Sequence, residues 1–307
     1  MRVSGKSNGI VDTAHGVLSG RTIVWSARLV WLAVAVLGGA PFGDALAAHS
    51  RPVQVVATIA LWMGWGSVAL ALLVPSTVAL TAVRAIVPLA LVCAGLAATG
   101  SSSVVEATVA LALCFVMVVL TASGEVGQMF VQASAYGDER RFLLRPPVGF
   151  IVPLVVSWSV AAACSIVGPL ALAARGWVPG VVLSLGAAGA WWFLAPRFHR
   201  LSRRWLVLVP AGVVLHDHVV LADTVMVATR NIAGLQLAYA DTEAADLTGP
   251  AAGHAVELAF GNLETVVLAP TRQTPGGRAL HVRSVLVAPT RPGRLLAAAR
   301  SRNLPVG

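Results

Sequence analysis

The sequence predicts an α-helical membrane domain with six transmembrane helices, followed by a small cytosolic β-rich domain that ends in a helix. Hydrophobic residues make up 57% of the chain and charged residues only 11%, whereas soluble domains carry about 25% charged residues. Residues 1–198 hold 17 of the charges and the shorter remainder holds 18. We therefore expect a disordered cytosolic N-terminus (1–22), a transmembrane domain (23–198) with a cytosolic loop (123–148), and a cytosolic β-domain (199–307).

The first apolar run, Ile23 to Ala40, allows two interpretations. A spanning helix needs about 20 apolar residues, so this run qualifies only with part of the membrane interface included. Its short apolar core, followed by Ala45-Leu-Ala47, also resembles a signal peptide that would be removed within residues 1–47. Because the polar segment before it is long for a signal peptide, we favour an uncleaved helix.

Five further runs are long and apolar on all sides, which is typical of helices surrounded by lipid or by other helices. They are Val53 to Val74, Val78 to Ala98, Val104 to Ala122, Gly149 to Ala173 and Val178 to Pro196. With the first run they give six predicted spans.

The arginines orient these spans, because basic residues collect on the cytoplasmic side of a membrane protein. With the N-terminus inside, only Arg51 and Arg175 lie outside. The inner side then holds Arg2, Lys6, Arg21, the Arg84 end of the third helix, Arg140, Arg141, Arg145, Arg197, Arg200, Arg203 and Arg204. We predict a multi-pass protein of the cell (inner) membrane with both termini cytoplasmic.

A polar segment from Gly124 to Pro147 separates the fourth and fifth spans. Its arginines, with the two that follow the sixth span, could bind anionic lipid headgroups or a protein partner, since guanidinium groups donate to phosphate and carboxylate oxygens. These candidates are Arg140, Arg141, Arg145, Arg203 and Arg204. The interpretation that we favour is a positive-inside anchor, in which these arginines and the acids Asp138 and Glu139 pair with one another or with solvent. A third possibility is docking of the segment onto the C-terminal domain. Nucleic acid is not expected as a partner, because no aromatic-basic motif accompanies the charge.

Arg84 in the third span and Glu106 in the fourth are charges within the predicted membrane domain. Such charges cost about 2.5–3.5 kcal/mol on insertion scales and suggest a functional site. Near the inner end of its helix, however, Arg84 can reach the interface, and Glu106 lies near the outer end. We therefore expect no direct pair between them.

The C-terminal part contains short β-type segments separated by turns such as Gly261-Asn262 and Pro275-Gly-Gly277. The predicted strands are Trp205–Val209, Val213–His216, His218–Ala222, Thr224–Ala228, Ile232–Tyr239, Ala255–Phe260, Thr265–Ala269 and Leu280–Val287. A helix is predicted over Arg294–Arg302, with Pro292 suited to its first turn. Between the strands, an acidic loop holds Asp241, Glu243 and Asp246.

His216 and His218 form the pattern most typical of metal ligands, because residues two apart on a strand share a face. Asp223, His254 and His281 could complete such a site only if the fold brings them close. Histidines on an exposed strand or turn are the alternative that we favour. No cofactor is expected, because the sequence contains no dinucleotide, P-loop or His-Glu-x-x-His motif.

Seven or so short strands closed by one helix resemble the pleckstrin-homology-like (PH-like) fold that is appended to many bacterial membrane proteins. The whole chain also resembles a family of uncharacterised actinobacterial membrane proteins. The residues that carry this likeness are Tyr136-Gly-Asp-Glu-Arg-Arg-Phe142, Arg145-Pro-Pro147, the segment from Arg204 to Asp217, Leu221-Ala-Asp223 and Pro289-Thr-Arg-Pro292. The resemblance implies the fold and supplies no activity.

A helical anchor joined to a cytosolic β-domain favours a non-enzymatic scaffold or regulator that docks a protein partner or a lipid surface. A small transporter or transporter subunit is the first alternative, suggested by Arg84, Glu106 and the prolines Pro88 and Pro153. The second alternative is a membrane-embedded enzyme with a site at the cytosolic face.

Overall fold

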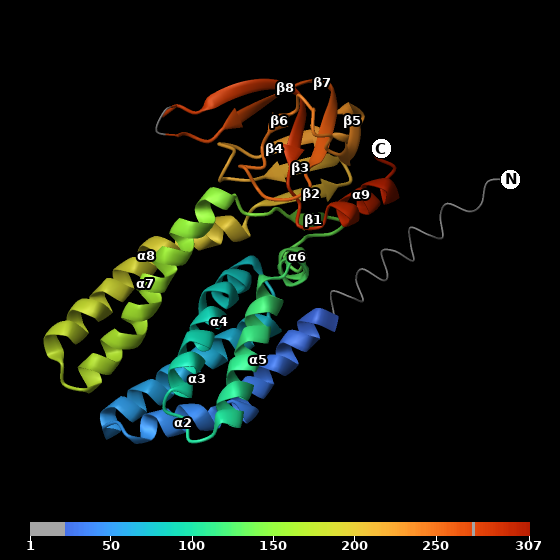
Figure 1. Ribbon diagram of the computed structural model, residues 1–307. Helices are drawn as coiled ribbons and strands as arrows, with labels where there is room; N and C mark the ends of the chain where they lie inside the picture. Colours follow the sequence, from blue (N-terminus) through green and yellow to red (C-terminus); the bar gives the residue numbers. More distant parts are fainter. Residues whose placement is uncertain (1–21, 272–273) are drawn as a thin grey trace. The chain divides into compact units, whose positions relative to one another are not determined.

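The computed structural model describes residues 22–271 and 274–307, so all but the last residue of the predicted disordered N-terminus lies outside the described residues. The described chain divides into two compact units (Figure 1). The helical unit comprises Thr22–Gly127 and Pro153–His199, and the β-unit comprises Gln128–Val152 and Arg200–Gly307. The β-unit is therefore built from two segments, whereas the sequence suggested one continuous domain from residue 199.

Six helices in the described part are long and apolar enough to cross a membrane, as the sequence predicted. They are Thr22–Ala47, α3 (Arg51–Leu73), α4 (Thr77–Ala98), α5 (Val104–Ala122), α7 (Val148–Ala173) and α8 (Trp177–Ser202). The first continues past its predicted end at Ala40, with a break at Gly38 before α2 (Gly39–Ala47). Pro41 explains the break, because proline cannot donate to the carbonyl four residues earlier and clashes with it.

Indole groups join the helices of this unit. The Nε1 atoms of Trp31 and Trp65 each donate to the backbone carbonyl of the other residue, both at 2.9 Å. Trp158 Nε1 donates to the carbonyl of Ala85 in α4, also at 2.9 Å. Indole N–H groups in apolar surroundings need such acceptors.

Helices α7 and α8 form an antiparallel hairpin that packs through small residues (Figure 1). A Cβ atom on Gly168 would lie 2.7 Å from the backbone nitrogen of Ser184, and one on Gly180 would lie 2.7 Å from that of Leu172. Such short distances show that the two backbones approach closely, which only small residues allow.

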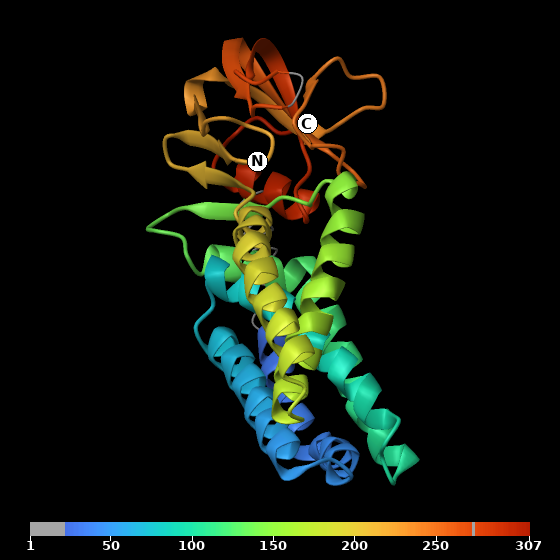
Figure 2. The same cartoon turned by 90° about the vertical axis from the view of Figure 1, so that its left-hand side faces the viewer.

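The β-unit contains two four-stranded sheets. The first has the order β1 (Arg140–Leu143), β2 (Trp205–Val209), β3 (Gly212–His216), β4 (Val225–Ala228), and all its pairs are antiparallel. The second has the order β5 (Ile232–Leu237), β7 (Val256–Leu268), β8 (Arg278–Val287), β6 (Ala245–Asp246), in which only β6 and β8 are parallel. Helix α9 (Pro292–Ser301) packs at one end of the sheets (Figures 1 and 2).

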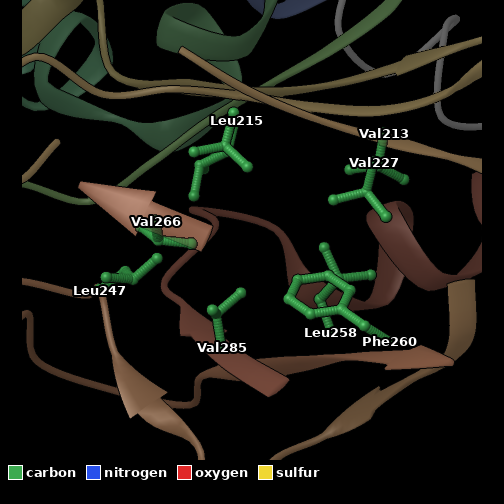
Figure 3. A pocket seen from close by; sticks show the side chains of 9 residues that line it. Val213, Leu215, Val227, Leu247, Leu258, Phe260, Val266 and Val285 are labelled. Carbon is green, nitrogen blue, oxygen red and sulfur yellow. The ribbon is translucent and has the colours of Figure 1, made fainter. Parts of the chain in front are cut away.

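The core of the β-unit lies between the two sheets. Figure 3 shows Leu215 and Val213 of the first sheet facing Leu258 and Val266 of the second. The free volume among these side chains is about 10 Å³, which is room for a single water molecule. The space between the sheets is therefore a packed core, to which α9 contributes Leu295.

Two predicted boundaries in the β-unit differ from the structure. The segment predicted as a strand over 218–222 is a turn at residues 218–220 followed by an isolated antiparallel bridge between Leu221 and Leu268 of β7. The turn forms because the Asp217 carboxylate accepts from the backbone nitrogen of Val219 at 3.1 Å and the Asp217 carbonyl accepts from that of Leu221 at 2.8 Å. The strands predicted on either side of Gly261-Asn262 are one strand, β7, with a register shift between Ala259 and Glu264.

Strand β6 lies in the predicted acidic loop and was not predicted, and neither were two elements of the polar segment. The polar segment between the fourth and fifth spans begins with helix α6 (Gly124–Gln132) and contains β1. Strand β1 has only four residues, and two of them are arginines, so it carries no clear alternating pattern. It forms because it pairs with β2, more than sixty positions later in the chain.

Candidate functional site

Five of the β-unit's side chains meet at one end of the first sheet. We call this group the Trp205 cluster, and its members are Arg141, Arg203, Trp205, His216 and His218. Trp205 pairs directly with His216 across β2 and β3, while Arg141 pairs with Val207, two residues along β2. Residues two apart share a face of a sheet, so the arginine lies beside the indole.

The aromatic rings of the cluster lie in contact. The rings of Trp205 and His216 stack with centroids 5.0 Å apart and planes 14° apart. Arg141 Cζ lies 5.2 Å from the centroid of the Trp205 ring, a cation–π contact, and its Nη2 also pairs with Glu139 Oε2 at 2.9 Å. His218 meets the His216 ring edge to face, with centroids 4.4 Å apart.

His216 is held in its neutral form. Its Nε2 lies 3.5 Å from Arg203 Nη2, and its Nδ1 lies 3.0 Å from Thr224 Oγ1. Since a guanidinium only donates, Nε2 is the acceptor and Nδ1 carries the proton that is donated to the threonine hydroxyl. Burial, and then the nearby positive charge of His218, Arg203 and Arg141, lower the pKa of His216 to about 4; Asp217 opposes them.

The alternative of a metal site at His216 and His218 is not supported by this geometry. The structure brings His216 and His218 together, but both ring nitrogens of His216 already have partners. Of the other candidates, His281 lies against Thr265, at 3.0 Å from its hydroxyl. Across residues 22–271 and 274–307, no group of three or more His, Cys, Asp or Glu side chains is placed to hold a metal ion.

Arg204, predicted to bind lipid or a partner, is instead buried with Asp217, and each side chain is 1% exposed. Its Nε lies 2.9 Å from both carboxylate oxygens and its Nη2 lies 2.7 Å from Oδ2. It also donates to the carbonyls of Arg145 at 2.7 Å and Thr248 at 3.1 Å. Arg204 therefore joins four chain segments inside the β-unit and cannot reach an external anion.

Arg145 is also engaged within the β-unit. It donates to the carbonyl of His254 and lies against Gly253, whose φ of +92° favours glycine. Burial lowers the pKa of Arg145, and its Nε is buried without a hydrogen-bond partner. Of the five predicted anion contacts, Arg140 and Arg203 are exposed, while Arg141 is half-buried and paired with Glu139.

The sequence contained a signal that separates the buried Arg204 from the exposed Arg203, and the prediction did not use it. Period-two alternation places Arg204 on the inward face of the first sheet with Leu206 and Leu208, and Asp217 on the same face with Leu215. The same alternation places Trp205 and His216 together on the other face. The strand pattern could therefore have identified Trp205 as a member of the outward-facing cluster and Asp217 as the buried partner of Arg204.

In the helical unit, Arg84 of α4 contacts the last turn of α5, whereas Glu106 lies in the first turn of α5. Arg84 Nε donates at 3.3 Å to the carbonyl of Thr121 in the last turn, whereas Glu106 is exposed in the first turn. At 1.5 Å per residue these turns are about 22 Å apart. Arg28, which was not predicted as a site, similarly donates to the carbonyl of Leu72 at 3.1 and 2.9 Å, in the last turn of α3.

Compared with protein-family models, curated proteins and solved structures, the chain gives no match.

Proposed function

We propose that this protein is a non-enzymatic regulator or scaffold of the cell membrane, with both termini cytoplasmic. In this proposal the six helices anchor a PH-like β-unit, which docks onto an anionic membrane surface through Arg140 and the Trp205 cluster. The element order of two sheets followed by α9 supports the PH-like assignment.

The observation that carries the proposal is the charge of Arg203. Its side chain is exposed, it directly follows Ser202 at the end of α8, and its contact is the neutral imidazole of His216. Within the described ranges no carboxylate lies within salt-bridge distance of Arg203 or of exposed Arg140. Among the described residues, neither guanidinium is therefore paired with a carboxylate.

The position of Arg203 in the chain favours a membrane surface over a separate protein. Consecutive Cα atoms are about 3.8 Å apart, so Arg203 cannot lie far from the end of a helix that has the length and composition of a span. A basic residue close to an anionic surface contributes about 1 kcal/mol. Arg140 and Arg203 would together contribute about 2 kcal/mol, and less in high salt.

The test compares the full chain in nanodiscs of phosphatidylcholine alone and of phosphatidylcholine mixed with phosphatidylglycerol. We expect slower amide hydrogen exchange over residues 203–218 in the anionic discs, with the difference lost in high salt. Arg140→Gln with Arg203→Gln should abolish the difference. Arg283→Gln, which removes an exposed arginine on β8, is the matched control and should leave it unchanged.

Equal exchange in the two lipids would overturn docking onto the membrane. If crosslinking in native membranes then captured a protein through residues 203–218, the same surface would be assigned to a protein partner.

A further inference from the structure

Helix α6 lies along the outer edge of β1. Strand β1 is the first in its sheet, so no strand among the described residues pairs with its far edge. Two glutamines of α6, Gln128 and Gln132, occupy that edge instead. Unpaired edges of this kind invite pairing with other chains, and proteins commonly cover them.

The two glutamine amides bond to the backbone of β1 as a neighbouring strand would. Gln132 Oε1 accepts from the Arg141 nitrogen, and Gln132 Nε2 donates to the Glu139 carbonyl, both at 2.9 Å. Gln128 Oε1 accepts from the Leu143 nitrogen at 3.0 Å, and Gln128 Nε2 donates to the Arg141 carbonyl. Both backbone groups of Arg141 are therefore fixed by α6.

The spacing of the glutamines explains this fit. Four residues along an α-helix rise about 6.0 Å, and two residues along a strand advance about 6.6 Å. Successive glutamines one turn apart therefore meet successive outward-facing peptide groups of β1. Each glutamine side chain supplies one donor and one acceptor, the same pair that a peptide group supplies.

We propose that Gln128 and Gln132 are positioning residues for the Trp205 cluster. The proposal rests on the function proposed above. Arg141 links the glutamines to the Trp205 cluster, because its backbone is held by both glutamines and its guanidinium lies over Trp205. Gln132 also fixes Glu139, the partner of that guanidinium.

The connection from α5 to α6 is short and well held. Only Ser123 separates the two helices, and its hydroxyl donates to the Leu120 carbonyl at 2.6 Å and accepts from the Val126 nitrogen at 3.3 Å. The side chains of Val126, Phe130 and Val131 are completely buried.

The test uses the double variant Gln128→Ala with Gln132→Ala, and the pair Gln128→Glu with Gln132→Glu, in full-length protein. The glutamates keep the accepting oxygen and the side-chain shape but remove the donor, so they serve if the alanine variant folds poorly. Gln54→Glu is the control, because Gln54 Nε2 also donates to a backbone carbonyl, that of His49 at 2.9 Å, but in the helical unit.

Two readouts separate positioning from simple covering of the edge. We expect the variants to lose the difference in exchange between anionic and neutral lipid over residues 203–218, although no residue of the cluster has changed. We also expect the pKa of His216, followed by hydrogen exchange at its imidazole C2 atom, to rise as Arg141 moves away and the ring is less buried. The Gln54 control should change neither.

Faster exchange at the Arg141 and Leu143 amides with both readouts unchanged would overturn the proposal and leave the glutamines as a cover for the edge. The two proposals fail differently. If wild-type protein shows no dependence on anionic lipid, the proposed docking function fails, and the His216 titration still decides whether the glutamines position the cluster.

Discussion

The two units of this protein accommodate half-buried and buried arginines in different ways. In the helical unit, Arg28 and Arg84 each donate to a backbone carbonyl in the last turn of a neighbouring helix. In the β-unit, Arg204 is enclosed with the carboxylate of Asp217 and has two further carbonyl acceptors. In the helical unit the full positive charge of the guanidinium faces the partial negative charge of a carbonyl oxygen. In the β-unit it faces the full negative charge of a carboxylate.

This difference follows from where a long side chain can go. The carboxyl end of a helix carries about half a negative charge, and an arginine near the end of a span can extend towards the interface. The Arg204 side chain lies in a closed core, so it must be neutralised where it is. We therefore expect the two kinds of arginine to respond very differently to substitution.

The largest effect is expected for Arg204→Met, which leaves the Asp217 carboxylate buried without a partner. Removing one member of a buried pair costs about 3–5 kcal/mol. Urea unfolding of the full chain in detergent, followed by amide exchange in β2 and β3, measures the loss. The double variant Arg204→Met with Asp217→Leu should recover much of it. A single variant as stable as wild type would show that the pair does not hold the β-unit together.

The helical unit was predictable because one strong signal decides it. A run of about 20 apolar residues has few structures open to it besides a spanning helix. Four predicted runs match their helices within a few residues, while the first helix continues to Ala47 and α8 continues to Ser202. The prediction missed the break at Gly38, because the apolar character of the run gives no information about the effect of a single proline. The position of Pro41 alone contained that information.

The β-unit was less predictable because its elements depend on distant partners. Helix α6 and β1 are fixed by β2 and by the Gln128 and Gln132 amides, none of which a local pattern reveals. Among the site residues, composition alone could not separate Arg203 from Arg204. Only strand alternation separates them, because it places one towards the core and the other towards solvent.

A smaller effect is expected for Arg84→Gln, which keeps a donor for the Thr121 carbonyl but removes the charge. Cations at helix carboxyl ends contribute about 0.3–1 kcal/mol when exposed and up to about 2 kcal/mol when partly buried. Thermal unfolding in detergent should therefore show a loss well below that of Arg204→Met. Arg84→Glu should cost more, because it places a negative charge beside the negative end of α5. A cost for Arg84→Gln as large as that of Arg204→Met would remove the distinction between the two units.

The smallest effect is the pH dependence that His216 gives to the β-unit. Burial and neighbouring cations lower its pKa from 6.5 to about 4 in the folded protein, so between these values the unfolded chain binds more protons. Folding stability from this group is therefore complete above about pH 6.5 and is lost as the pH falls towards 4.

His216→Asn, which removes the titrating ring, should reduce the fall in melting temperature between neutral and acid pH. His281→Asn, at the exposed histidine beside Thr265, is the control and should leave the fall unchanged. An identical acid-induced fall in wild type and His216→Asn would show that the imidazole is not held neutral in the folded protein.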